Sequence, residues 1–318
     1  MKKIRRAALT LALLLLLTTP VLARQLLIPG GQVIGLELEG GRIMIVSFSP
    51  DQARALWEAG VQPGDELIAL DGRRMDRLEQ LQQELQQSDG EVTLTLRRGE
   101  QEKTVRLCPK ITREGPRLGL YLRQGVSGIG TVTWYDPETG QYGALGHGVR
   151  SAQEELTGGS LYPASVASVK KGQSGIPGQL RGRLQSRNSC GSIEKNQDQG
   201  IFGISQNGWP GEPLPVALRS ELHPGKATIR STVTGTDLQE YDVEIVKLYP
   251  GSGKDGRNLL LQITDPRLLK LTGGIVQGMS GSPIIQDGRL IGAVTHVLVN
   301  DPTKGYGIFI ENMLDAAG

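Results

Sequence analysis

Apolar residues follow a helical period in only two short stretches near the start of this chain. Residues 51–59 are predicted to be a short helix, with Ser49 as its N-cap and Pro50 at its first position. Leu78, Leu81 and Leu85 predict a second helix, because apolar positions three to four residues apart share a helix face. Alternating residues at 92–96 and 104–107, on either side of Gly99, predict a β-hairpin. We therefore expect a small α+β domain over residues 25–108.

The segment 115–318 shows almost no helical period until its last few residues. Short apolar runs recur there between turn signals, at 128–134, 142–145, 227–233, 241–248, 258–263, 283–285, 290–299 and 306–310. This spacing predicts a barrel or sandwich of antiparallel strands. The 44 glycines and the 4% aromatic content agree, because tight turns between short strands need glycine. The chain is expected to be mainly β.

The first 23 residues differ from everything that follows. A basic start with Lys2, Lys3, Arg5 and Arg6 precedes an apolar run over 7–18, and Val21-Leu22-Ala23 resembles a cleavage site. The apolar run is shorter than the roughly 20 residues that cross a bilayer comfortably. Residues 1–23 therefore predict export, either as a signal peptide that is removed or as a retained membrane anchor.

Charge and cysteine content exclude several classes of protein. The net charge is +2, and no Lys/Arg stripe with interleaved aromatic residues appears, so nucleic acid is not an expected partner. The two cysteines, Cys108 and Cys190, lack the spacing of metal ligands, and we expect no metal and no cofactor. Two separate thiols are preferred over a disulfide between them.

The strongest chemical signal is the run Gly278-Met279-Ser280-Gly281-Ser282-Pro283. A serine nucleophile needs room for the scissile carbonyl and backbone amides that face the developing oxyanion, and glycines on both sides provide these. The amides of Gly278 and Ser280 are the predicted oxyanion donors. An apolar hairpin through Asp287-Gly288 follows, which favours a trypsin-like barrel over an α/β-hydrolase, where a helix follows the serine. A purely structural glycine turn is the alternative.

The serine needs a base, and the chain has three histidines. His147 lies between two glycines just after an apolar strand, where an imidazole can be presented to substrate, and it is the preferred base. His296 ends the strand after the nucleophile hairpin, which predicts a place on the substrate pocket. His223 precedes Pro224 in a polar stretch and is interpreted as a loop residue.

The third, orienting carboxylate is the least defined by spacing. Asp265 follows an apolar strand, from which a buried carboxylate could reach the imidazole, and its alternative role is that of a turn former before Pro266. The other candidates are Asp136, Asp198, Asp237, Asp242 and Asp255.

The first domain resembles PDZ domains of the bacterial protease-associated type. The resemblance rests on residues 59–65 (AGVQPGD) and on Leu70-Asp71-Gly72. It implies binding of peptide C-termini by β-augmentation. The peptide-binding loop is expected at Val33, Ile34, Gly35 and Leu36, with the helix of Leu78, Leu81 and Leu85 beside it. For these leucines a core role is the alternative, and it is favoured.

Over nearly its whole length the chain resembles the SpoIVB peptidases, which are sporulation serine proteases of the chymotrypsin-like clan. The likeness rests on Gly146-His147-Gly148, on the segment 265–283, on Thr295-His296-Val297 and on residues 300–307. It implies a PDZ domain followed by a trypsin-like double β-barrel over 115–318. It also implies His147 as base, Ser280 as nucleophile and Asp265 as the third triad member.

The resemblance further implies a role in sporulation. Such a protease acts in the space between forespore and mother cell and can cleave itself. It cleaves a membrane-bound regulator of an intramembrane protease, which triggers late sigma-factor processing. A quality-control PDZ protease is the alternative, although those place the PDZ domain after the protease. The remaining alternative is a non-catalytic PDZ adaptor.

Overall fold

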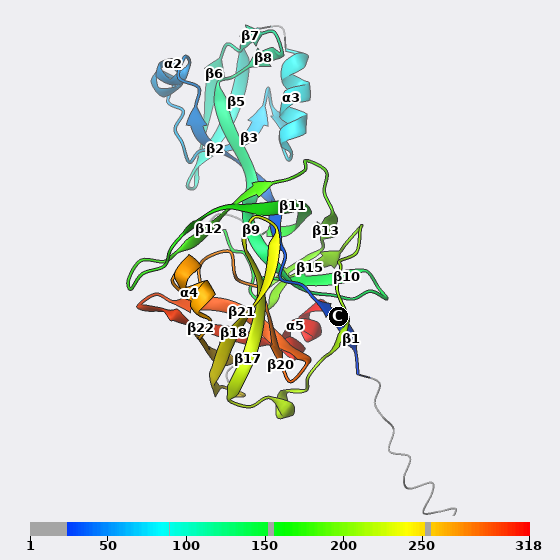
Figure 1. Ribbon diagram of the computed structural model, residues 1–318. Coiled ribbons are helices and arrows are strands. Elements are labelled where there is room, and N and C mark those ends of the chain that lie inside the picture. Colours follow the sequence, from blue (N-terminus) through cyan, green and yellow to red (C-terminus); the bar gives the residue numbers. More distant parts are fainter. Residues whose placement is uncertain (1–23, 89, 152–155, 252–255) are drawn as a thin grey trace, which may run out of the picture.

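The computed structural model describes residues 24–88, 90–151, 156–251 and 256–318 (Figure 1). The chain is mostly β, with 55% of residues in strands and 12% in helices, which confirms the expected fold class. The predicted signal or anchor, residues 1–23, lies outside the described residues. Within those that are described, no helix has the length and apolar character needed to span a bilayer.

The smaller lobe, at the top of Figure 1, is the domain expected to be a PDZ domain. It contains helices α2 (Ala53–Glu58) and α3 (Leu78–Gln86) and strands β3 (Glu66–Leu70), β4 (Arg73–Arg74), β5 (Val92–Arg98) and β6 (Gln101–Leu107). Leu81 and Leu85 of α3 pack into its core beside Leu94 and Leu96 of β5. The two predicted helices and the hairpin are therefore confirmed, although α2 begins at Ala53 and is not capped by Ser49.

Two long strands run from the PDZ domain into the protease domain. They are β2 (Val33–Phe48) and β9 (Leu120–Tyr135), which pair antiparallel from Val33↔Thr131 to Phe48↔Leu120. The first half of β2 belongs to the protease core, where Ile34, Leu36 and Leu38 are buried. The PDZ domain thus emerges from the ends of this ribbon, and it does not begin at residue 25 as expected.

The N-terminal half of the protease domain is a strongly curved sheet. Its strands are β1 (Leu26–Pro29), β10 (Gln141–Ala144), β11 (Leu156–Lys170), β12 (Gln179–Leu184), β13 (Gly191–Ile193), β14 (Lys195–Gln197), β15 (Gly200–Ile204) and β16 (Leu214–Pro215). They add to β2 and β9, and the bond from the Gln206 amide to the Cys190 carbonyl ties the β15 end back to β13. Apart from β10, these strands were not predicted, since their glycine-rich and polar sequences give no clear alternation.

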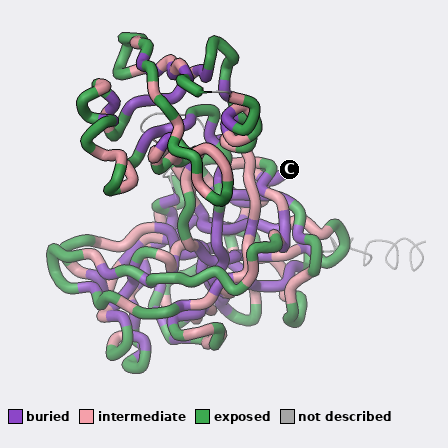
Figure 2. Tube along the Cα trace, turned by 90° about the horizontal axis from the view of Figure 1, so that it is seen from above, coloured by how far each residue is buried: buried purple, intermediate pink, exposed green. Residues whose placement is uncertain are grey.

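The C-terminal half is a closed barrel in the order β17-β18-β19-β22-β21-β20. These strands are β17 (Gly225–Thr234), β18 (Asp237–Leu248), β19 (Leu259–Ile263), β20 (Pro283–Gln286), β21 (Arg289–Leu298) and β22 (Asp301–Phe309). All six match predicted apolar segments. The short helices η1 (Arg219–Glu221), α4 (Pro266–Thr272) and α5 (Ile310–Ala317) flank it. Figure 2 shows buried residues concentrated in the centre of this domain and exposed ones at the loops.

Candidate active site

The turn that carries Ser280 connects α4 to β20 and depends on two glycines in the left-handed region. Gly278 has φ +98° and Gly281 has φ +97°. A Cβ atom on Gly281 would lie 2.1 Å from the Thr131 carbonyl oxygen and 2.6 Å from the Leu145 amide nitrogen. Such contacts are far too short, so only glycine fits here. The glycine flanks inferred from the sequence thus hold the nucleophile turn against the N-terminal half of the domain.

Thr131, near the C-terminal end of β9, makes two hydrogen bonds to this turn and a third to the histidine loop. Its hydroxyl donates to the Gly278 carbonyl at 2.8 Å, and its amide donates to the Ser280 carbonyl at 3.2 Å. Its own carbonyl accepts the Leu145 amide at 3.1 Å, two residues before His147. Thr131 is fully buried. Its hydrogen bonds connect the nucleophile turn to the histidine loop. Its place inside an apolar strand gave no sign of this role.

The amides predicted to form the oxyanion hole are available. In the described parts of the chain, neither Gly278 nor Ser280 donates its N–H to a backbone carbonyl. Their neighbours are engaged, since Met279 donates to Val276 and Gly281 donates to Val294. Two free amides beside a serine hydroxyl suit a developing oxyanion, because preorganised donors need no rearrangement during the reaction.

His147 follows β10 on a loop that bends sharply at Leu145 and Gly146, with φ of +69° and +70°. Its Nδ1 lies 2.9 Å from the Gly148 carbonyl oxygen. A carbonyl can only accept, so this contact assigns the proton to Nδ1 and leaves the lone pair on Nε2. Burial lowers the pKa of His147, and the Gly148 carbonyl opposes this shift only partly. At neutral pH the imidazole is therefore uncharged, as a base must be.

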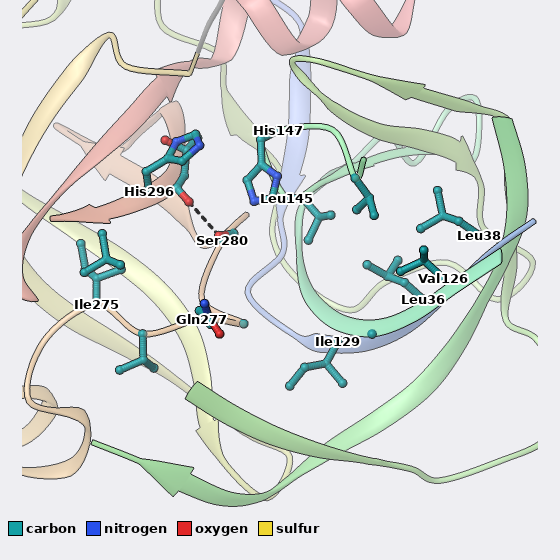
Figure 3. A pocket seen from close by; sticks show the side chains of 16 residues that line it. Leu36, Leu38, Val126, Ile129, Leu145, His147, Ile275, Gln277, Ser280 and His296 are labelled. Atoms are coloured by element: carbon teal, nitrogen blue, oxygen red, sulfur yellow. Dashed lines mark hydrogen bonds between the residues drawn. The ribbon is translucent and has the colours of Figure 1, made fainter. Parts of the chain in front are cut away.

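Ser280, His147 and His296 line one cleft with a volume of about 360 Å³ (Figure 3). The rings of His147 and His296 lie side by side, with centroids 5.4 Å apart. The Ser280 hydroxyl donates to the Thr295 carbonyl at 2.7 Å. The structure thus brings the predicted nucleophile, base and pocket histidine together. In this arrangement the hydroxyl proton points to β21, so the hydroxyl must turn toward Nε2 before it can attack.

Asp265 lies elsewhere, at the N-cap of α4, and this corrects its assignment as partner of His147. Its carboxylate accepts from the amides of Arg267 and Leu268 and pairs with the Arg267 guanidinium at 2.7 Å. The Arg267 side chain lowers the pKa of Asp265 to about 2, although burial opposes this shift. Asp265 does not line the cleft. The alternative interpretation of Asp265, as a turn former before Pro266, agrees with this geometry.

None of the other candidate carboxylates that the structure describes lines the cleft. Asp136 accepts from the Glu138 amide in a turn, and Asp198 pairs with Arg150 on the surface. Asp237 accepts from Gln239, and Asp242 is exposed. Asp255 lies outside the described residues. Among the residues that the structure does describe, the Gly148 carbonyl is the group that holds the His147 imidazole.

A second groove lies in the PDZ domain, between α3 and the start of β9, with a volume of about 590 Å³. Leu78, Leu81 and Leu85 line it from the helix, so these leucines serve both core and groove. Its opposite wall is the segment 118–122, which includes the start of β9 and is preceded by the hairpin of β7 (Lys110–Thr112) and β8 (Gly115–Arg117). In the described structure that strand pairs only with β2, so its other edge can receive a peptide.

This location corrects the prediction of a peptide-binding loop at Val33–Leu36. Those residues lie within β2, with β9 on one side and β11 on the other, so they have no free edge. The loop that leads into the groove contains Gly119, with φ +70°, between two leucines. The same glycine-between-apolar signal exists at Gly35, and only the strand order distinguishes the two.

The fold and the cleft define the class as a PDZ-containing serine protease. The SpoIVB peptidase S55 family profile matches residues 114–314, and a PDZ profile matches residues 55–98. The chain therefore belongs to the SpoIVB peptidase family, as its sequence motifs implied.

Solved structures and curated proteins add little to this. The Rv3671c protease of M. tuberculosis in its active form is 15% identical, with 61% of this chain and 75% of that chain covered and a TM-score of 0.37. The inactive form of the Rv3671c protease is 14% identical, covering 59% and 82%, with a TM-score of 0.35. No curated protein matches. In the described residues no cluster of side chains could hold a metal ion.

Proposed function

We propose that this protein is a serine endopeptidase in which Ser280 is the nucleophile and His147 the general base. The observation that carries the proposal is the cleft that joins Ser280, two free amides and a neutral imidazole with its lone pair on Nε2. In the first step the Ser280 oxygen attacks a peptide carbonyl while its proton moves to Nε2 of His147. The carbonyl oxygen becomes an oxyanion that the amides of Gly278 and Ser280 hold.

The second half of the reaction uses the same groups. The His147 imidazolium gives its proton to the leaving amine as the peptide C–N bond breaks, and an acyl-enzyme remains on Ser280. Water, deprotonated by His147, then attacks the ester and releases the acid. The Gly148 carbonyl accepts the hydrogen bond from the Nδ1–H group throughout and keeps the imidazole in the required tautomer. Among the residues that the structure describes, the group that orients the base is thus a neutral backbone carbonyl.

We extend this proposal to sporulation signalling. Family membership supports an enzyme exported by residues 1–23 that acts between forespore and mother cell on a membrane-bound regulator of an intramembrane protease. The PDZ groove supports recognition of protein C-termini, because an extended peptide can pair with the free edge of 118–122 and place apolar side chains against α3.

A fluorophosphonate probe tests the proposed chemistry. Wild-type protein is expected to be labelled at Ser280, and Ser280→Ala is expected not to be labelled while its thermal unfolding stays unchanged. His147→Ala should slow labelling by several orders of magnitude, whereas His296→Ala should slow it far less. Labelling that persists in Ser280→Ala, or a folded wild type that is never labelled, would show that Ser280 is not the nucleophile.

The signalling role has its own test. The protease and the regulator are produced together in one membrane system, and the regulator is followed by immunoblot. Cleavage that requires Ser280 supports the role. An intact regulator beside a fluorophosphonate-reactive protease would contradict the role and leave the chemistry standing.

A further inference from the structure

The described residues that line the cleft beside Ser280 include no carboxylate, lysine or arginine side chain. Leu36 and Leu38 are buried at its base, whereas Val126, Ile129 and Val297 are only partly covered and can contact a ligand. The volume of about 360 Å³ is at the lower end of the roughly 300–1,000 Å³ of ligand pockets. The cleft therefore has room for a few medium-sized side chains.

The apolar residues form two walls on opposite sides of the catalytic groups (Figure 3). The first wall comes from the β2–β9 ribbon and includes Leu38, Val126 and Ile129. The second wall comes from the C-terminal barrel and includes Ile275 and Val297. His147 lies on the side of the first wall. The oxyanion amides lie between the walls, since a Cβ on Gly278 would be 3.4 Å from Ile129 of the first wall.

The position of these walls assigns each side of the scissile bond. The leaving amine must lie near His147, because the imidazolium delivers its proton, so the residue after the scissile bond lies against the first wall. The residue before the bond extends in the opposite direction from the attacked carbonyl, so it lies against the second wall. A charged side chain at either place would lose its hydration without gaining a partner, which is unfavourable.

Resting on the serine endopeptidase function above, we propose that the substrate is an extended segment with aliphatic residues on both sides of the scissile bond. Valine, isoleucine, leucine or methionine fits each wall, and charged residues at these two positions are excluded. In this assignment Val297 selects the residue before the bond and Ile129 selects the residue after it. The segment of a substrate that the cleft binds is therefore an apolar stretch that is exposed to the protease in an extended conformation.

The experiment uses full-length protein and five peptides that differ only at the scissile pair: Leu-Val, Lys-Val, Asp-Val, Leu-Lys and Leu-Asp. Their kcat/KM values are measured by mass spectrometry. Leu-Val is expected to be cleaved fastest, and each charged residue should lower kcat/KM by about 100-fold, within the roughly 10- to 200-fold range of lost apolar contacts. Equal cleavage of the charged peptides by enzyme that is labelled at Ser280 would overturn the substrate class alone.

Two variants test the walls. Val297→Asp should raise cleavage of Lys-Val relative to Leu-Val by at least about 10-fold, and Ile129→Lys should do the same for Leu-Asp relative to Leu-Val. The matched control Val246→Asp lies on β18, is 44% exposed and should keep the wild-type order. Folded variants that keep the wild-type order would overturn the wall assignment. If the wild type neither reacts with the probe nor cleaves any peptide, the proposed function itself fails.

Discussion

Replacing Asp265 by asparagine distinguishes a structural carboxylate from a catalytic one. The Asp265 carboxylate is 2% exposed, and its pKa lies at about 2 instead of the ordinary 3.8. At about 1.4 kcal/mol for each pH unit, this difference corresponds to about 2 kcal/mol of stabilisation at neutral pH. Asparagine still accepts the helix amides as an N-cap but loses the charge that pairs with Arg267. We expect Asp265→Asn to lower the free energy of unfolding by about 1–2 kcal/mol.

Catalysis should respond differently. Because Asp265 does not contact His147 in the described structure, kcat/KM of the folded variant should fall by less than about 10-fold. If the Asp265 carboxylate oriented the imidazole, replacing it by asparagine would instead lower kcat of the enzyme roughly 10⁴-fold. The assays are urea unfolding and peptide hydrolysis, with the exposed Asp198→Asn as control for loss of a surface ion pair.

The pH dependence provides a further check. A carboxylate whose folded-state pKa is depressed stabilises the fold above its unfolded pKa and loses this effect as the pH falls through the folded value. The difference in unfolding free energy between wild type and Asp265→Asn should therefore shrink between pH 3.8 and about 2. A drop of 10⁴ in kcat with unchanged stability would refute this reasoning and restore Asp265 to the triad.

Three further predictions concern the nucleophile turn and the base. Thr131→Val removes the hydroxyl bond to Gly278 at 2.8 Å, and hydrolysis assays should show a 10- to 100-fold lower kcat, about 1–3 kcal/mol, with an almost unchanged KM. A larger effect on KM than on kcat would contradict its role in holding the turn. Gly281→Ala places a Cβ 2.1 Å from the Thr131 carbonyl oxygen, so thermal unfolding should show a loss of more than about 2 kcal/mol, whereas Gly288→Ala, with open space around it, should lose less. Because burial lowers the pKa of His147, the acid limb of the kcat/KM profile should have its midpoint below pH 6.5; a midpoint above 6.5 would show that the imidazole is stabilised in its charged form.

Local sequence determined much of this protein, because its signals act over a few residues. Short apolar runs between turn signals identified all six strands of the C-terminal barrel, since a strand that packs on the core must present apolar side chains to it. The helical spacing of three leucines identified α3 for the same reason. The glycines around Ser280 and His147 marked the two sharp turns, because only glycine tolerates such close backbone approach.

Only the tertiary structure decided how these parts combine. The β2–β9 ribbon pairs residues that lie 72 to 98 positions apart, from Phe48↔Leu120 to Val33↔Thr131, so the sequence could not show that Val33–Leu36 is interior to a sheet. Strand order likewise placed the free PDZ edge at 118–122 and brought Thr131 under the nucleophile turn.

The serine motif could thus be identified from its neighbouring residues, whereas the group that orients the His147 base could not. An aspartate before a proline suits both a helix N-cap and a triad, and its sequence is the same in either case. Arg267, two residues further along the chain, pairs with the Asp265 carboxylate. Among the described residues, the Gly148 carbonyl is then the group beside the His147 imidazole. Features that depend on neighbouring residues, such as the nucleophile turn, could be derived from the sequence. Contacts across the cleft could not, because they depend on how the N- and C-terminal halves of the protease domain pack together.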